Sequence, residues 1–469
     1  MGFQQQVIAD GPARYVLPRI GDMKTDVVAF LSPDLFAQTD EALWSQAARA
    51  ATYEGAIGLY LMPDTHLGYG IPVGGVLVTD DTIVQAGSGY DISCGVVYMR
   101  VPDLHAADVA DWDARARWVR AVEARIALGI GDHRPRGAPH VRLDHIEDIL
   151  LHGAKALGVP ADLCERQFIE VEEAAFDPRA IPRAWAKARP QLGSVGGGNH
   201  FIEMQVDRDD GSVWVMVHCG SRGYGWQTAN HFFYEGARLR GLPANRRESS
   251  WLRADEPLGR SYWAHHNSAA NYAVANRHTI VRGVGEATVE VFGKQPDVYF
   301  EISHNLVQRE TLVLPDGSTR LGFVHRKGAT RAFPAGHPDL RGTRWAETGH
   351  PCLIPGSMLD GAAVLFPLEG AYASGCSVNH GSGRLMGRGH AKRELAHLHD
   401  EIDAEMATVT RTLGGVAVTG VVGNTARTPL DECGHAYKDL DAVLGVLEAQ
   451  GIARVAHRLF PVANLKGAD

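Results

Sequence analysis

Short apolar segments separated by glycine turns constrain the fold of this chain more than any other feature. Between residues 55 and 100 such segments alternate with the turns Gly-Tyr-Gly, Gly-Gly and Gly-Ser-Gly. This pattern is typical of β-strands joined by tight turns, because glycine adopts backbone angles that other residues avoid. Glycine-rich sequence returns at residues 191–227, and strands are expected again at about residues 289–324. The strands therefore come from distant parts of the chain.

Helical tracts interrupt this glycine-rich sequence. Alanine, arginine, glutamate and leucine recur at helical spacing across about residues 103–188, and further helices are expected at about 258–285 and 389–413. No internal repeat or low-complexity linker divides the chain. The sequence predicts an α+β fold: one large domain over residues 1–469, with glycine-rich strands and loops around a central site, peripheral helices, and a helical insertion at about residues 103–188.

The composition is that of a globular protein. The 469 residues are 45% hydrophobic, and no run approaches the roughly 18 apolar residues of a membrane span. Residues 1–20 carry charges and proline where a signal peptide is apolar, so we expect a cytoplasmic protein without a membrane partner. The six cysteines lack CxxC spacing, which argues against a zinc finger or a disulfide framework. The net charge of -9 argues against nonspecific coating of nucleic acid but permits a local basic groove.

Five residues of metal-ligand type stand beside glycines or at the ends of apolar runs. Asp91 and Cys94 are three residues apart in one turn, His200 follows three glycines, and His218 and His304 end strand-like segments. Each one alone has an ordinary explanation, such as a buried cysteine or a hydrogen-bonded core histidine. Together, their thiolate, imidazole and carboxylate groups suit a two-ion site with a bridging thiolate.

A sixth residue, His380, lies in a turn of small residues, Gly-Cys-Ser-Val-Asn-His-Gly-Ser-Gly-Arg. A core histidine normally packs among bulky apolar side chains, whereas these neighbours let a large anionic group approach. We interpret His380 as a nucleophile toward phosphorus, because a neutral imidazole attacks phosphorus and can pass the group on. Arg222, in the glycine turn after His218, suits an anion better than a core.

These segments resemble the RtcB family of RNA-splicing ligases. The matching motifs are Met-Pro-Asp-x-His-x-Gly-Tyr-Gly-x-Pro-x-Gly-Gly, Gly-Tyr-Asp-Ile-x-Cys-Gly, Gly-Asn-His-Phe-x-Glu, His-x-Gly-Ser-Arg-Gly-x-Gly, the histidine–arginine loop at 380–384 and Ala-Tyr-Lys-Asp near the end, spread over residues 62–466. The resemblance implies an RtcB-like catalytic domain that uses GTP and two Mn²⁺ ions. It implies ligation of RNA 3′-phosphate or 2′,3′-cyclic phosphate ends to 5′-hydroxyl ends, in tRNA splicing or RNA repair, through a guanylylated histidine and an RNA(3′)pp(5′)G intermediate. The natural RNA and any activating protein are left open.

The resemblance also assigns roles to individual residues. His380 becomes the guanylylated histidine, Asp91, Cys94 and His200 hold one manganese ion, and Cys94, His218 and His304 hold the other. Asp64 supports the metal site and is counted with the catalytic residues. The expected nucleotide-binding residues are Asn199, Phe201, Glu203, Asn305, Pro355, Gly356, Ser357, Met358, Gly381, Gly383, Tyr437 and Lys466. The residues expected to bind RNA phosphates are Arg222, Arg384 and Arg388.

Two segments depart from the family's pattern, and two other functions are weighed. Residues 374–380 are longer and less regular than the usual Ser-Cys-Ser-His-Gly-Ala-Gly-Arg, and Gly-Ala-Ala at 361–363 stands where the family usually has a serine. A two-metal phosphodiesterase or phosphatase acting on nucleic-acid ends without GTP is the main alternative. A non-enzymatic RNA-binding scaffold is disfavoured, because the ligand-type residues would then have no purpose. The other histidines, at 265, 266, 390, 397 and 399, are expected on solvated helix surfaces.

Overall fold

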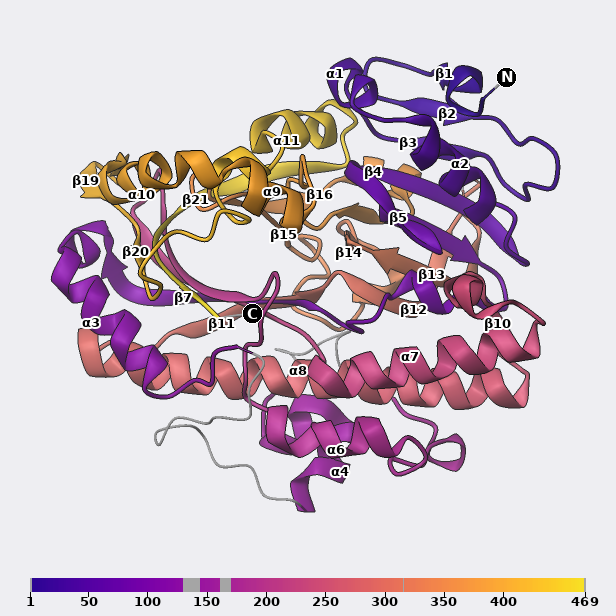
Figure 1. Ribbon diagram of the computed structural model, residues 1–469, viewed down its shortest axis with the longest axis horizontal. Coiled ribbons are helices and arrows are strands. Elements are labelled where there is room, and N and C mark those ends of the chain that lie inside the picture. Colours follow the sequence, from indigo (N-terminus) through magenta and orange to yellow (C-terminus); the bar gives the residue numbers. More distant parts are fainter. Residues whose placement is uncertain (1, 130–143, 161–169, 315, 468–469) are drawn as a thin grey trace.

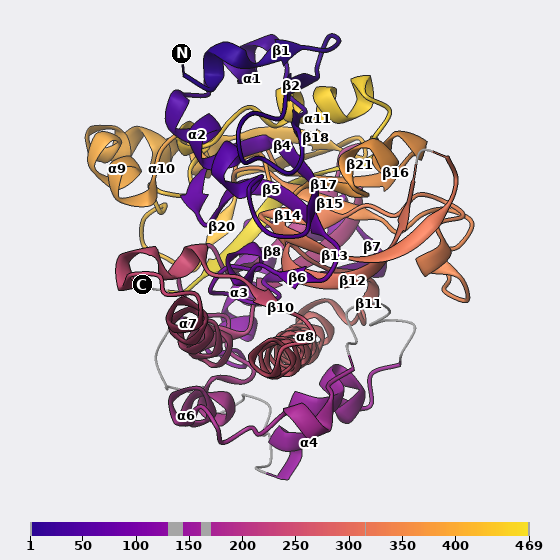
Figure 2. The same ribbon diagram turned by 90° about the vertical axis from the view of Figure 1, so that its right-hand side faces the viewer.

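Two large sheets and a layer of helices form the fold (Figures 1 and 2). The computed structural model describes residues 2–129, 144–160, 170–314 and 316–467. The seven-stranded sheet has the order β1 (Ile8–Ala9), β2 (Tyr15–Leu17), β3 (Val27–Ala29), β4 (Ala56–Tyr69), β5 (Ile71–Thr79), β13 (Thr319–Lys327), β12 (Asn305–Val313). The eight-stranded sheet has the order β11 (Asp297–Ser303), β7 (Gly95–His105), β9 (Ser212–Cys219), β8 (Phe201–Asp207), β21 (Ala453–Lys466), β16 (Ala362–Pro367), β15 (Cys352–Pro355), and β20 (Val422–Gly423) pairs with β21. Two-stranded sheets join β6 (Thr82–Ile83) to β10 (Leu252–Arg253), β14 (Ala329–Arg331) to β17 (Ser377–Asn379), and β18 (Thr410–Leu413) to β19 (Val416–Thr419). The predicted α+β class is confirmed.

The centre of the eight-stranded sheet is buried on both faces. Along β7, Val96 and Tyr98 pack into the core shared with the seven-stranded sheet. The alternate residues Val97 and Met99 pack into a second core with α3 (Trp112–Glu123) and α8 (Pro257–Phe292). Because side chains of a strand alternate between faces, a strand covered on both sides has to be apolar throughout, as β7 and β9 nearly are.

The 36-residue helix α8 runs horizontally below the sheets in Figure 1. Pro257 stands in its first turn, and Gly293 ends it with φ at 68°, a backbone conformation that glycine tolerates. The helix α7 (Arg222–Leu239) lies beside α8, and α6 (Pro182–Gln191) and α4 (Asp144–His152) lie on their outer side (Figure 2). The helix expected at 258–285 is confirmed. The expectation of solvated histidines at 265 and 266 is wrong, because Phe176, Phe232 of α7 and strand β12 cover this part of α8 and leave these residues 3% and 0% exposed.

The last expected helix, at 389–413, is wrong in its extent. It breaks into α9 (Arg388–Glu394), a short turn and α10 (His399–Thr408), after which the chain enters β18. A further helix, α11 (Leu440–Ala449), follows, and the N-terminal part adds α1 (Pro33–Ala37) and α2 (Glu41–Ala50). The expected insertion at 103–188 contains α3, α4 and part of α6, while residues 130–143 and 161–169 lie outside the described residues. None of the helices in the described ranges is long and apolar enough to cross a bilayer.

Candidate active site

Neighbouring strand ends bring the ligand-type residues together. Cys94 immediately precedes β7, and His200 immediately precedes β8. His218 lies in β9, opposite Phe201 of β8, and His304 separates β11 from β12. The register of one sheet therefore sets the distances among side chains that are more than 200 positions apart in the sequence.

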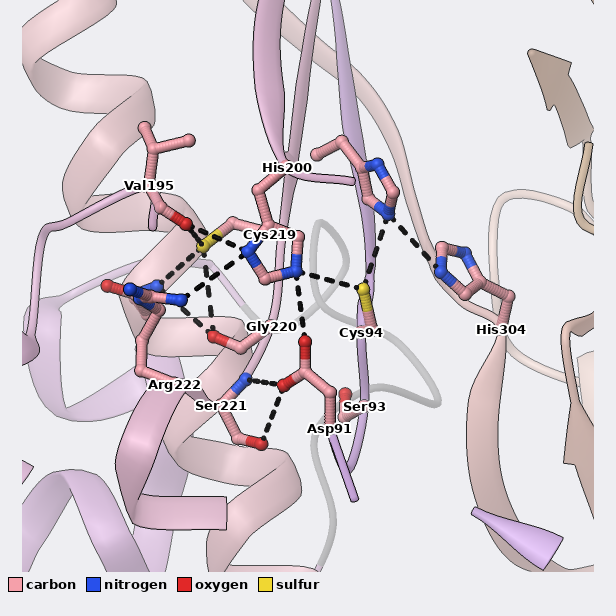
Figure 3. Close-up of polar contacts among 12 residues, drawn as sticks. Asp91, Ser93, Cys94, Val195, His200, Cys219, Gly220, Ser221, Arg222 and His304 are labelled. Carbon is pink, nitrogen blue, oxygen red and sulfur yellow. Dashed lines mark hydrogen bonds and ion pairs between the residues drawn. The ribbon is translucent and has the colours of Figure 1, made fainter. Parts of the chain in front are cut away.

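The donor atoms form two groups that share one sulfur (Figure 3). Cys94 Sγ lies 3.3 Å from Nε2 of both His200 and His218. His218 Nε2 lies 3.3 Å from His304 Nε2, and His200 Nε2 lies 2.9 Å from Asp91 Oδ2. The donor atoms of Asp91, Cys94 and His200 lie within 4.8 Å of one another, as do those of Cys94, His218 and His304. These groups coincide with the two ligand sets that the family resemblance implies.

The hydrogen bonds around these groups fit divalent ions. His200 Nδ1 donates to the Val195 carbonyl at 2.9 Å, which leaves the Nε2 lone pair free as a ligand. Among the described residues, His218 Nδ1 is buried without a hydrogen-bond partner. Imidazole lone pairs and a sulfur facing one another this closely repel unless a cation lies among them. The donor set therefore fits two ions with a bridging thiolate.

Burial and local charge set the protonation of these groups. Burial raises the pKa of Asp91, but the contact with the His200 ring, the charge of Arg222 and the hydrogen bond from Ser221 outweigh it and lower the pKa to about 2. Burial and the Asp91 carboxylate raise the pKa of the Cys94 thiol. Burial and neighbouring histidines lower the pKa of His218. An ionised carboxylate and neutral imidazoles are the forms in which these side chains bind metal.

Arg277 of α8 holds the backbone behind the candidate ligands. Its guanidinium donates to the carbonyls of Ser93 at 2.6 Å and Cys219 at 3.0 Å, and to Ser303 Oγ at 3.4 Å. Each of these three residues adjoins a candidate ligand in the sequence. Glu301 balances the charge at 2.7 Å, and both side chains are 0% exposed. One buried cation thus fixes three ligand-bearing segments relative to one another.

Arg222 lies beside the metal-type cluster at the start of α7. Its Nη1 lies 3.5 Å from His200 Nδ1, and its Nε donates to Ser194 Oγ at 3.3 Å. A Cβ at Gly196 would lie 1.9 Å from this guanidinium, so the glycine run before His200 makes room for Arg222. Binding of RNA phosphate by Arg222 stays a prediction.

His380 faces the cleft from the turn after β17. Its Nδ1 lies 2.8 Å from Oδ2 of the fully buried Asp64, and its ring centroid lies 5.0 Å from that of His304. The structure places the Asp64 carboxylate against His380, and its expected support of the metal site stays a prediction. The close approach of two chain segments causes this contact, because a Cβ at Gly383 would lie 2.9 Å from Asp64. The Nε2 atom of His380 remains available for chemistry.

A second buried arginine holds the irregular loop before His380. Arg326 forms a bidentate ion pair with Glu310, with one of its two contacts at 2.9 Å. It also donates to the Cys376 carbonyl at 3.1 Å and to Ser377 Oγ at 2.9 Å. Cys376 has φ at 48°, which is uncommon for a residue other than glycine. These contacts fix the segment that departs most from the family's pattern.

The expected nucleotide-binding residues line two adjoining spaces. A cleft of about 410 Å³ contains His380 and His218. The members of the set that line this cleft are Asn199, Phe201, Asn305, Pro355, Gly356, Gly381, Gly383 and Tyr437. A smaller cavity beside it is lined by Phe201, Glu203, Pro355, Gly356, Ser357, Met358 and Lys466. At the second departure, a Cβ at Gly361 would lie 2.0 Å from the Leu459 carbonyl, so no side chain fits there.

Glu432 is a residue that the sequence interpretation missed. Its carboxylate pairs with Lys466 at 2.6 Å and with Arg384 at 2.8 Å, and it accepts from the Tyr437 hydroxyl at 2.6 Å. Its position beside Asp431, shortly before the Ala-Tyr-Lys-Asp motif, was the available signal. Lys466 reaches this site because β21 pairs with β8 and sets Lys466 opposite Phe201.

Carboxylates hold the two remaining arginines, of which Arg384 lines the cleft. Arg384 donates to Asn199 Oδ1 at 3.0 Å in addition to its pair with Glu432. Arg388 pairs with Asp431 at 2.7 Å, and its side chain is 32% exposed. Binding of RNA phosphates by Arg384 and Arg388 stays a prediction.

Comparisons with known proteins agree with this geometry. A family model described as "tRNA-splicing ligase RtcB" matches residues 46–467. The tRNA-splicing ligase RtcB of Thermococcus kodakarensis is 34% identical over 90% of this chain and 90% of its own length. The RNA-splicing ligase RtcB of Mycobacterium tuberculosis is 33% identical over 90% of this chain and 100% of its own. The tRNA-splicing ligase RtcB of Archaeoglobus fulgidus is 31% identical over 95% of both chains.

Replacing Arg277 by leucine should lower the free energy of unfolding by about 3–5 kcal/mol, because Glu301 is left buried without its main partner. Replacing both Arg277 and Glu301 by leucine should recover part of this loss, since no unpaired charge remains. Denaturant unfolding measures both variants. A loss below about 1 kcal/mol in the single variant would show that the pair does not hold the ligand-bearing segments.

Replacing Cys94 by alanine should abolish tight binding of metal ions at both candidate groups, because its sulfur belongs to both. Asp91→Asn should weaken the binding of only one ion. Elemental analysis after dialysis against Mn²⁺ counts the ions, and the rise in unfolding temperature with Mn²⁺ reports their binding independently. Cys352→Ala, which removes another buried thiol far from the cluster, is the matched control. Two tightly bound ions in Cys94→Ala would contradict the shared-sulfur arrangement.

Glu203 should make the protein less stable as pH rises from about 4.5 to 7. Burial raises its pKa to about 7, although hydrogen bonds from Asn464 and Gln205 oppose the shift. Within this window the folded protein holds a proton on Glu203 that the unfolded chain has lost. The free energy of unfolding therefore falls as pH rises, and this decrease is complete above about pH 7. Across this pH window the stability of Glu203→Gln relative to wild type should therefore rise by about 3 kcal/mol. A difference that does not change with pH would contradict the raised pKa.

Proposed function

Because this chain belongs to the RtcB family of tRNA-splicing ligases, we propose that it is a GTP- and manganese-dependent RNA ligase. It joins RNA 3′-phosphate or 2′,3′-cyclic phosphate ends to 5′-hydroxyl ends, in tRNA splicing or RNA repair. The observation that carries the proposal is the 2.8 Å contact between His380 Nδ1 and the buried Asp64 carboxylate, at the edge of the metal-type cluster. This contact prepares one histidine as a nucleophile.

In the first step His380 Nε2 attacks the α-phosphorus of GTP. A nitrogen–phosphorus bond forms, and the bond to the leaving pyrophosphate breaks. Asp64 accepts the Nδ1–H hydrogen bond, so the lone pair stays on Nε2, and the carboxylate stabilises the positive charge that develops on the ring. The buried position of Asp64 strengthens this interaction.

In the following steps the GMP group activates the RNA end. The RNA 3′-phosphate attacks the histidine-bound phosphorus and releases His380, after which the 5′-hydroxyl attacks the activated 3′-phosphate and displaces GMP. A 2′,3′-cyclic end is first hydrolysed to the 3′-phosphate. When bound by Asp91, Cys94, His200, His218 and His304, the two manganese ions would neutralise charge on the phosphate oxygens and lower the pKa of a bound water or hydroxyl.

The nucleotide would occupy the part of the cleft that adjoins the small cavity. Lys466 supplies a positive charge there, held by Glu432, and Glu203 supplies buried acceptor oxygens. The guanidinium groups of Arg222, Arg384 and Arg388 suit RNA phosphates, because their planar forks match phosphate oxygens. For Arg384 and Arg388 a phosphate has to compete with carboxylates that already contact them.

Incubation with α-labelled GTP and Mn²⁺ should label the wild-type protein covalently, and His380→Ala should take no label. Asp64→Asn should label at least about 100-fold more slowly, because an amide no longer holds the reactive tautomer or the charge. The label is measured after denaturation. His390→Ala, a histidine more than half exposed on α9, is the matched control and should label like wild type.

Two outcomes would contradict the proposal. An unlabelled wild type would favour the phosphodiesterase or phosphatase alternative, which keeps the metals but does not use GTP. A labelled His380→Ala variant would show that another residue is the nucleophile.

A further inference from the structure

Three aromatic side chains form a continuous series at one end of the cleft, here called the aromatic ledge (Tyr69, Tyr90 and Trp226). Tyr69 and Tyr90 line the same cleft as His218 and His380. The Tyr90 ring centroid lies 5.3 Å from that of Tyr69 and 5.4 Å from that of Trp226, with only 20° between the planes of the last two. The ledge thus begins beside the reacting groups and leads out to α7.

Trp226 ends the ledge on the protein surface. Its side chain is 44% exposed, whereas Trp44, Trp118 and Trp214 are at most 1% exposed. It lies one helical turn after Arg222, on the helix that flanks the metal-type cluster. A large aromatic face left in water next to a catalytic cleft is typical of a binding surface.

Hydrogen bonds fix the two tyrosine rings of the ledge before anything binds. The Tyr90 hydroxyl donates to Glu248 Oε1 at 2.7 Å and accepts from Arg247 at 3.1 Å. The Tyr90 backbone N–H donates to the Tyr69 hydroxyl at 3.1 Å, and Phe233 packs edge-on against Tyr90 with centroids 4.9 Å apart. Rings held in this way lose little entropy when a planar group stacks on them.

The chemistry of the ledge favours bases over phosphates. The Arg247 charge is offset by Glu248 at 3.1 Å, so the outer part of the ledge offers aromatic faces with little net charge. Other residues of the cleft lining, Pro355, Gly356 and Tyr437, belong to the expected nucleotide pocket. The ledge is therefore left for the other substrate.

We propose that Tyr90 and Trp226 form a stacking subsite for unpaired nucleobases next to the reacting end of the RNA. The inference rests on the proposed function, which makes RNA the second substrate of this cleft. Every base has an aromatic face, so the subsite accepts any sequence but requires single-stranded nucleotides at the end.

The test uses a single-stranded RNA with a 3′-phosphate and 2-aminopurine near that end, titrated with protein and Mn²⁺ in the absence of GTP. Trp226→Ala should bind about 10-fold more weakly or worse and should quench the 2-aminopurine less, because one stacking partner is lost. Trp226→Phe should recover most of the affinity. The slope of log affinity against log salt should not change, because stacking releases no counterions. Trp112→Ala, which removes a tryptophan 43% exposed on α3, is the matched control.

Thermal unfolding confirms that each variant is folded. RNA affinity and quenching of Trp226→Ala within twofold of wild type would overturn the proposal that the ledge stacks bases. An equal loss of RNA affinity in Trp112→Ala would also overturn it. Failure of the wild type to take label from GTP would refute the proposed function instead, and the RNA titration would still decide whether the ledge stacks bases.

Discussion

The buried ion pair between Arg277 and Glu301 is the interaction on which the site depends. The metal-type side chains come from segments that share no local sequence, and strand register alone leaves the turns beside them free to move. Arg277 binds the backbone of two of these turns and the side chain beside a third, while it is anchored in the longest helix of the fold. A buried ion pair adds little net stability, but the loss of one partner is costly. The pair therefore contributes more to fixing this one arrangement than to the free energy of unfolding.

The Arg326–Glu310 pair plays the corresponding part for the nucleophile. It lies between the seven-stranded sheet and the loop that leads to His380, and it binds two loop carbonyls and a serine hydroxyl. One arginine thus fixes the metal half of the cleft and another fixes the histidine half. Because both are fully hydrogen-bonded and buried, neither half has to be ordered by the substrate.

The cleft between these halves has two chemically different ends. At one end Lys466 of strand β21 pairs with Glu432, and we propose that this end binds the guanine nucleotide. The other end carries the aromatic ledge and opens along α7. His380 also lines this cleft, with its Nδ1 in contact with Asp64, so in the proposed reaction the group carried on its Nε2 passes from the nucleotide to the RNA.

The sequence by itself determined the kinds of chemistry and the class of fold. Glycine turns and apolar runs predicted the strands, helical spacing predicted α8, and the residue types at 91, 94, 200, 218, 304 and 380 predicted metal ligands and a nucleophile, because these features depend on local chemistry. The tertiary structure decided which groups meet. Asp64 contacts His380, histidines 265 and 266 are buried, and Glu432 contacts three residues that were expected to bind nucleotide or RNA. Such contacts join segments up to 316 positions apart. Strand register and packing determine them, and a local sequence pattern contains no information about either.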